Sequence, residues 1–142
     1  MGDYTEIKID MRLRQETPED VRATLRYMTC TLDGPRSGYE REDFEHAHPL
    51  FATPRWSYML TCGSAYHEAE PSREWLEAGN RLRSISNFKH YDGEIGLFAS
   101  WIREWCVPQD GPIITQMSEY DDEHLTVLAG DLTFTPDPRA KR

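Results

Sequence analysis

The chain of 142 residues lacks the sequence features that would identify a membrane-spanning protein, a secreted protein or a nucleotide-binding protein. No apolar run approaches the roughly 18 residues that a spanning helix needs. The first residues have neither the basic segment nor the apolar stretch of a secretion signal. A glycine-rich phosphate loop is also missing. We therefore expect a soluble, cytoplasmic protein that uses no cofactor.

Cysteine and positive charge are both scarce. Cys30, Cys62 and Cys106 are an odd number without paired spacing, so they form neither a disulfide framework nor a CxxC metal knuckle. We expect reduced thiols packed among apolar neighbours. The 16 Lys and Arg are outnumbered by 25 Asp and Glu, which gives a formal net charge of -9. Affinity for duplex nucleic acid comes from basic groups that neutralise phosphates, so duplex binding is not expected.

Periodic apolar residues indicate the secondary structure. Residues 5–14 alternate strictly between apolar and polar, which predicts a strand with one buried face. Thr17 can cap a helix over residues 17–32, with an apolar stripe at Val21, Leu25 and Met28. A second helix is predicted after Asp92, and its stripe begins at Ile95. Further strands are predicted at residues 56–62, 81–88, 113–118 and 125–128.

This order of elements predicts an α+β protein. An antiparallel sheet with two helices on one face is a two-layer sandwich, with the ferredoxin-like order β-α-β-β-α-β-β. We expect one domain over residues 1–135, containing an irregular acidic loop at residues 33–54. A connection of this length in a compact domain is either functional or mobile. Residues 136–142 are expected to form a flexible tail.

Arginine and tryptophan side chains are the candidate binding residues. Arg55 directly precedes one predicted strand, Trp56 begins that strand, and Arg81 and Arg83 lie on the next. A guanidinium cluster on these neighbouring strands could hold an anion bidentately. The same arginines could equally balance the acidic residues of the first strand. Trp101 falls at the edge of the apolar stripe of the second helix. It is either exposed, as interface aromatics often are, or packed under a loop.

Histidines provide the alternative. His46 and His48 are two residues apart in the acidic loop and would point to one side of an extended backbone, as metal ligands can. A metal-dependent hydrolase of phosphoesters would need His67 and Asp121 to join them. A solvated polar loop is the other interpretation of the same residues.

Several short motifs resemble small uncharacterised proteins encoded by phages and prophages. The resemblance covers about residues 48–128, and it rests on residues 48–51 (HPLF), 53–56 (TPRW), 59–62 (MLTC), 86–92 (SNFKHYD), 94–95 (EI) and 101–102 (WI). It implies a viral accessory protein that works in the bacterial cytoplasm, and it carries over no active site.

The sequence therefore predicts a non-enzymatic accessory protein. We expect it to bind a host protein or a small anionic ligand through a sheet edge or the acidic loop, because negative charge and surplus aromatics occur without a catalytic set. The alternatives are the metal-dependent hydrolase above and a structural homo-oligomer formed by edge strands or by burial of Trp101.

Overall fold

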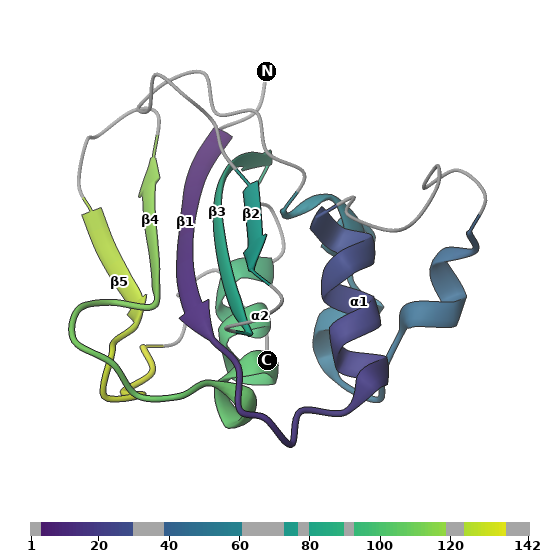
Figure 1. Ribbon diagram of the computed structural model, residues 1–142. Helices are drawn as coiled ribbons and strands as arrows, with labels where there is room; N and C mark the ends of the chain where they lie inside the picture. The colour runs from purple at the N-terminus through teal and green to yellow at the C-terminus, as the bar shows by residue number, and fades with distance from the viewer. Residues whose placement is uncertain are drawn as a thin grey trace.

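An antiparallel sheet and two α-helices make up the described part of the chain (Figure 1). The computed structural model describes residues 4–29, 39–60, 73–76, 80–89, 93–118 and 124–135. The strands are β1 (Tyr4–Arg12), β2 (Arg73–Leu76), β3 (Arg81–Lys89), β4 (Ile114–Ser118) and β5 (His124–Leu128). The helices are α1 (Glu19–Thr29) and α2 (Glu94–Ile102), and the 3-10 turns are η2 (Arg41–Phe44), η3 (Pro49–Ala52), η4 (Trp56–Tyr58) and η6 (Arg103–Trp105).

Strand β1 lies at the centre of the sheet. The strands follow the order β2-β3-β1-β4-β5, and each neighbouring pair is antiparallel. The predicted alternation in β1 is confirmed, because Ile7, Ile9 and Met11 are buried on one face while Lys8 and Arg12 are exposed on the other. The register continues the buried face across β3, where small side chains, Ser84 and Ser86, lie opposite Ile9 and Ile7.

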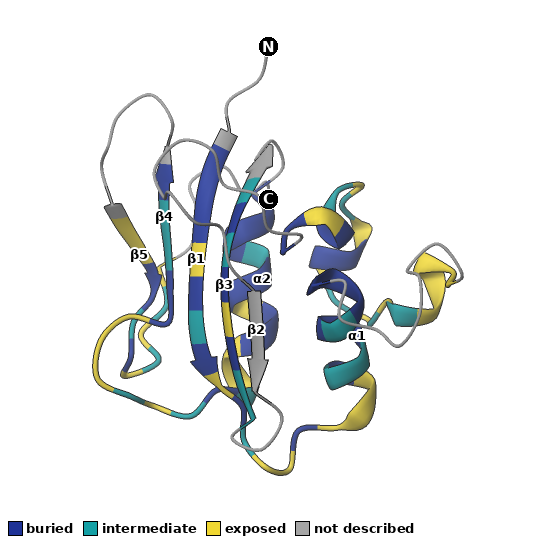
Figure 2. Ribbon diagram, turned by 45° about the horizontal axis from the view of Figure 1, so that its top comes forward, coloured by how far each residue is buried: buried dark blue, intermediate teal, exposed yellow. Residues whose placement is uncertain are grey.

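The two helices share one core with the inner face of β1. Val21, Leu25 and Met28 of α1 are buried there, as are Ile95 and Phe98 of α2. Figure 1 shows α2 behind the sheet and α1 beside it, and Figure 2 shows that α2 is more completely buried. The predicted apolar stripes and the predicted α+β class with an antiparallel sheet are thus confirmed. None of the helices in the described ranges is long and apolar enough to cross a membrane.

The ends of the helices differ from the prediction in detail. The Thr17 hydroxyl donates to the Arg14 carbonyl at 2.7 Å, and α1 begins two residues later at Glu19. Helix α2 is preceded by Gly93 at φ 74°, a left-handed conformation that favours glycine. The predicted cap residue Asp92 lies outside the described residues, as do Leu32 and residues 136–142.

The strand predicted at residues 56–62 is wrong over its described part. Residues 56–58 form the 3-10 turn η4, and Trp56, Met59 and Leu60 are buried while Tyr58 is 58% exposed. Spacings of three and four are helical, so the burial follows a helical period and not the alternation read from the sequence. The strand that pairs with the outer edge of β3 is β2.

Candidate functional site

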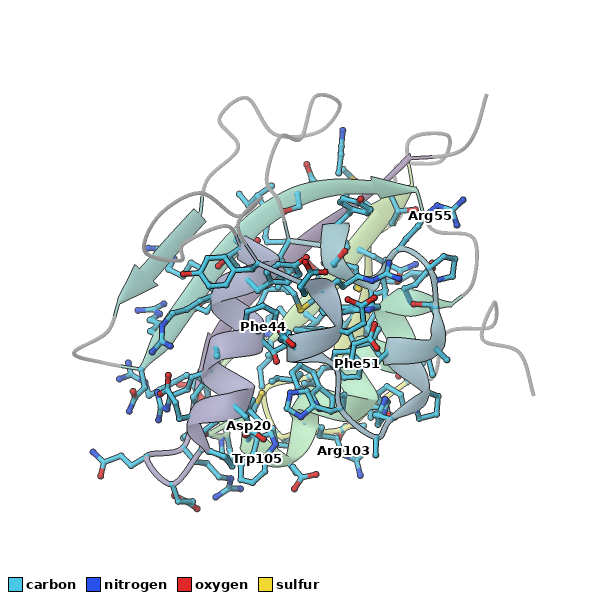
Figure 3. All side chains as sticks on the ribbon, turned by 90° about the vertical axis from the view of Figure 1, so that its right-hand side faces the viewer. Asp20, Phe44, Phe51, Arg55, Arg103 and Trp105 are labelled. Carbon is cyan, nitrogen blue, oxygen red and sulfur yellow. The ribbon has the colours of Figure 1, made fainter. Side chains whose placement is uncertain are left out.

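Residues 39–60 form a segment, here called the bridging segment, that packs against both helices. Its turns η2 and η4 contact α1, and η3 contacts α2. Figure 3 shows Phe44 and Phe51 of this segment facing the interior, whereas Arg55 points outward. The acidic loop predicted from the sequence is therefore ordered over its described part, and it separates two hollows of the surface.

A continuous row of aromatic rings holds the bridging segment in place. We call it the aromatic row, and its members in order of contact are Tyr39, Phe44, Tyr27, Trp56, Phe51 and Trp101. Tyr27 of α1 stacks on Phe44 with ring centroids 4.4 Å apart. Phe51 contacts Trp56 and Trp101 edge to face at 4.7 and 5.0 Å. Such geometries add to the free energy gained from burial, so the row fixes the segment against both helices.

The first hollow, the histidine cavity, lies where the start of α1 meets the end of α2. It has a volume of about 300 Å³, and its lining includes Asp20, His46, His48, Ser100 and Trp105. Figure 3 shows Asp20 and Trp105 close together at this end of the molecule. The structure therefore brings the two loop histidines to one cavity, as the spacing suggested, together with hydroxyl and carboxylate groups.

Both nitrogens of His48 take part in hydrogen bonds. Nδ1 accepts from the Leu50 backbone N–H at 3.0 Å and thereby caps η3. Because Nδ1 is an acceptor, the ring proton lies on Nε2, which donates to the Ser100 hydroxyl at 3.1 Å. Burial lowers the pKa of His48 below its usual value of 6.5, in keeping with this neutral form.

His46 forms a hydrogen bond with the hydroxyl oxygen of Thr24. The Thr24 hydroxyl lies 2.9 Å from the Asp20 carbonyl and 2.8 Å from the Phe44 carbonyl, so it donates to one of them. Its oxygen then accepts from His46 Nε2, 2.8 Å away. The imidazole ring also lies 5.2 Å from both Phe51 and Trp101. His46 therefore connects the bridging segment to α1.

These hydrogen bonds do not suit the predicted catalytic alternative. Of the four ring nitrogens, both of His48 and Nε2 of His46 are already used. The Ser100 hydroxyl oxygen accepts a hydrogen bond from His48 Nε2, so His48 in this tautomer cannot act as a base for Ser100. Within the described ranges, no three His, Cys, Asp or Glu side chains group as a metal site. His67 and Asp121 lie outside those ranges.

The second hollow, here called the tyrosine groove, lies on the other side of the bridging segment. Its volume is about 590 Å³, and it is lined by Tyr27, Tyr39, Glu40, Arg41, Glu42, Ser57 and Tyr58. Tyr39 is 40% exposed and Tyr58 is 58% exposed. Among the described residues only Leu125 is a further large exposed hydrophobic side chain, so two of the three meet at one groove.

The charges at the groove are mainly negative. Glu40 and Glu42 are exposed, and both line it. The Arg41 guanidinium donates to the Pro54 carbonyl at 3.1 Å, and its Nε lies 3.6 Å from Glu45. Glu45 also accepts from the indole N–H of Trp56 at 3.3 Å. The one basic side chain among the lining residues is therefore anchored to the bridging segment itself.

The tryptophans predicted as binding residues are buried. Trp56 is completely buried in the aromatic row, and Trp101 is 7% exposed. The interpretation of Trp101 as an exposed interface residue is therefore wrong. The other interpretation of Trp101, packing under a loop, is confirmed by its contacts with His46 and Phe51. The two tryptophans fill the core here, and the exposed aromatic rings in the described part of the chain are those of Tyr39 and Tyr58.

The predicted arginine cluster is divided between two elements. Arg81 and Arg83 share the outward face of β3, but Arg55 precedes η4 in the bridging segment and not a strand. Arg81 donates from two nitrogens to Asp10 of β1, at 3.0 and 2.9 Å. The alternative, that these arginines balance acidic residues of the first strand, is thus confirmed for Arg81.

Comparison of the chain with family models, with curated proteins and with solved structures finds no significant match. The site is therefore argued from its own geometry. The sequence indicated the acidic loop, but it did not indicate Tyr58, because that residue was assigned to a strand. Its exposure could have been found from the helical spacing of its apolar neighbours.

Proposed function

We propose that the protein is a non-enzymatic binding protein that engages a partner protein through the tyrosine groove. The observation that carries the proposal is the meeting of Tyr39 and Tyr58 at one groove. Tyrosine is enriched at protein interfaces because it offers a large ring together with a polar group. An exposed pair beside a hollow of about 590 Å³ is a surface that a partner can cover.

The histidine cavity supports binding in preference to catalysis. Its two imidazoles form hydrogen bonds with residues of α1, η3 and α2. Their role is then to hold the bridging segment in the shape that forms the groove. We also propose, from the resemblance of residues 48–128 to phage-encoded proteins, that the protein is a viral accessory protein and that its partner is a protein of a bacterial host.

A photocrosslinking experiment tests this function. The photoreactive amino acid p-benzoylphenylalanine replaces Tyr58 in one variant and Leu125 in a matched control, because both side chains are exposed and lie on different elements. In a bacterial host lysate, we expect one defined protein to crosslink at position 58 and not at position 125. That protein, once purified, should bind the unmodified chain, and Tyr58→Ala should weaken the binding. Identical crosslinks at both positions, or none at 58, would contradict the proposal.

The outward face of β1 and β3, which carries exposed basic side chains, offers a second candidate, the binding of a small anionic ligand. Lys8 and Arg12 of β1 and Arg83 of β3 are exposed there, beside the Arg81–Asp10 pair. Guanidinium groups bind phosphate or carboxylate bidentately. Titration with inorganic phosphate, followed through the arginine side-chain NMR signals, would test it. Arg83→Gln should abolish the shifts, and unchanged shifts would exclude the site.

We further propose that the fold is of the ferredoxin-like type with one added edge strand. The proposal is supported by the position of β1 between β3 and β4 and by the place of one helix before β2 and the other after β3. An experimental structure that also covers the remaining residues would test it. A different strand order would exclude it.

A further inference from the structure

We propose that the tyrosine groove receives a lysine or arginine side chain of the partner. This inference rests on the proposed function and names the chemistry of the group that is bound. The groove combines three tyrosine rings, from Tyr27, Tyr39 and Tyr58, with the carboxylates of Glu40 and Glu42. Aromatic faces and carboxylates together are the surroundings that stabilise an alkylammonium or guanidinium group.

Two of the three tyrosine rings at the groove, those of Tyr27 and Tyr39, are held in place by contacts with other aromatic rings. Tyr27 is 6% exposed and stacks on Phe44 at 4.4 Å, and its ring centroid lies 6.0 Å from that of Trp56. Tyr39 leans on the same Phe44 ring at 5.9 Å. Because these contacts order the Tyr27 and Tyr39 rings in advance, those two rings lose little conformational entropy when a side chain enters the groove.

Charge decides between a basic occupant and the other classes. Arg41 is directed to the Pro54 carbonyl and to Glu45, so Glu40 and Glu42 dominate the rim of the groove. The whole chain carries a formal net charge of -9, which attracts a basic segment over a longer range. An acidic side chain would be repelled by the same carboxylates, and an apolar one would gain from the rings alone.

Four peptides that differ at one central residue test the inference. The residue is lysine, arginine, norleucine or glutamate in an otherwise uncharged sequence, and binding is followed through the NMR signals of the tyrosine rings. We expect binding of the lysine and arginine peptides, weaker binding of the norleucine peptide and none of the glutamate peptide. Removing one aromatic ring that contacts the cation at an exposed site should reduce affinity about two- to fivefold. We therefore expect this loss of affinity for the lysine peptide in Tyr58→Ala and not in Tyr58→Phe, which keeps the ring.

Charge variants complete the experiment. The double variant Glu40→Gln/Glu42→Gln should weaken the binding of the lysine peptide and leave the binding of the norleucine peptide unchanged. Leu125→Ala is the matched control, and it should change the affinity for neither peptide. Equal affinity for lysine and norleucine peptides, both sensitive to Tyr58→Ala, would overturn the inference and leave the proposed function standing. Absence of all peptide shifts, with a crosslink at position 58 retained, would have the same meaning. Absence of both would remove the proposed function as well.

Discussion

His48 shows how one side chain can make the bridging segment sensitive to pH. Its Nδ1 caps η3 only while the ring is neutral, because protonation converts that acceptor into a donor. Its pKa in the folded protein is lowered by burial from the usual 6.5, so below that pH the unfolded chain binds the proton more readily. The stability that the neutral ring contributes is therefore complete above about pH 6.5 and is lost as the pH falls through the lowered pKa.

We predict that His48→Asn removes part of this pH dependence. Asparagine keeps an acceptor near the position of Nδ1 and does not titrate. Between about pH 7.5 and pH 5, the wild-type chain should lose about 1 kcal/mol more of its free energy of unfolding than the variant, the usual magnitude for a helix cap. Urea unfolding at the two pH values measures this difference. An equal loss in both proteins would contradict the role assigned to His48.

Cys106 should be chemically inert in the folded protein. Burial raises the pKa of its thiol to about 12, and the sulfur lies 3.9 Å from Met11 Sδ within the core. The thiolate is the reactive form, so almost none is present near neutral pH. We predict that iodoacetamide leaves Cys106 unmodified in buffer and alkylates it in concentrated urea, as read by peptide mass spectrometry. Alkylation in buffer at the unfolded rate would show that the core opens there.

The bridging segment is the element whose order depends most on single aromatic residues. Trp56 is completely buried and contacts both Tyr27 and Phe51, while Tyr58, two residues later, is mostly exposed. We predict that Trp56→Ala costs about 3–5 kcal/mol of the free energy of unfolding, the usual range for a large buried aromatic residue. Tyr58→Ala should cost under about 0.5 kcal/mol. Thermal or urea unfolding of the two variants compares them, and similar losses would contradict this assignment of core and surface.

Regular elements could be predicted from the sequence because their periods were uninterrupted. The alternation in β1 and the stripe through Val21, Leu25 and Met28 each repeat often enough to identify one structure. The run that begins at Trp56 contains large apolar residues at nearly every position, so spacings of two, three and four are all present. Contacts with α1 determine which residues of this run are buried, and a local sequence pattern contains no information on those contacts.

The candidate site was predictable only in outline. The length of the acidic connection at residues 33–54 indicated a loop that is either functional or mobile. The groove, however, is formed by three segments that are separate in sequence: α1, η2 and η4. The sequence placed Arg81 and Arg83 correctly on one strand, and the period of two in a strand puts both on the same face. Their partner Asp10 belongs to β1, and that pairing follows from the register of the sheet.

At the scale of the whole molecule, stability should decrease from the centre of the sheet outward. Strand β1 is paired along its length with β3 and over Thr5 to Ile9 with β4. Strand β5 is paired with β4 at one side, and at its other side an isolated bridge joins Leu128 to Phe134. Leu125 in β5 is also 46% exposed. Amides exchange with solvent when their segment opens, and segments with few buried contacts open at the lowest cost in free energy.

We predict that hydrogen exchange, followed by mass spectrometry, is slowest in peptides from β1 and at least about tenfold faster in peptides from β5. The core helix α2 provides a second slow reference, since Ile95, Phe98 and Ile102 are fully buried. If hydrogen exchange in β5 is slow, repeating the measurement on a diluted sample distinguishes two possible causes. Protection that persists on dilution would contradict the gradient within one molecule. Protection that is lost on dilution would mean that the edge of β5 pairs with a second copy, because exposed strand edges associate in this way. That result would favour the structural homo-oligomer over a protein that presents its groove to another partner.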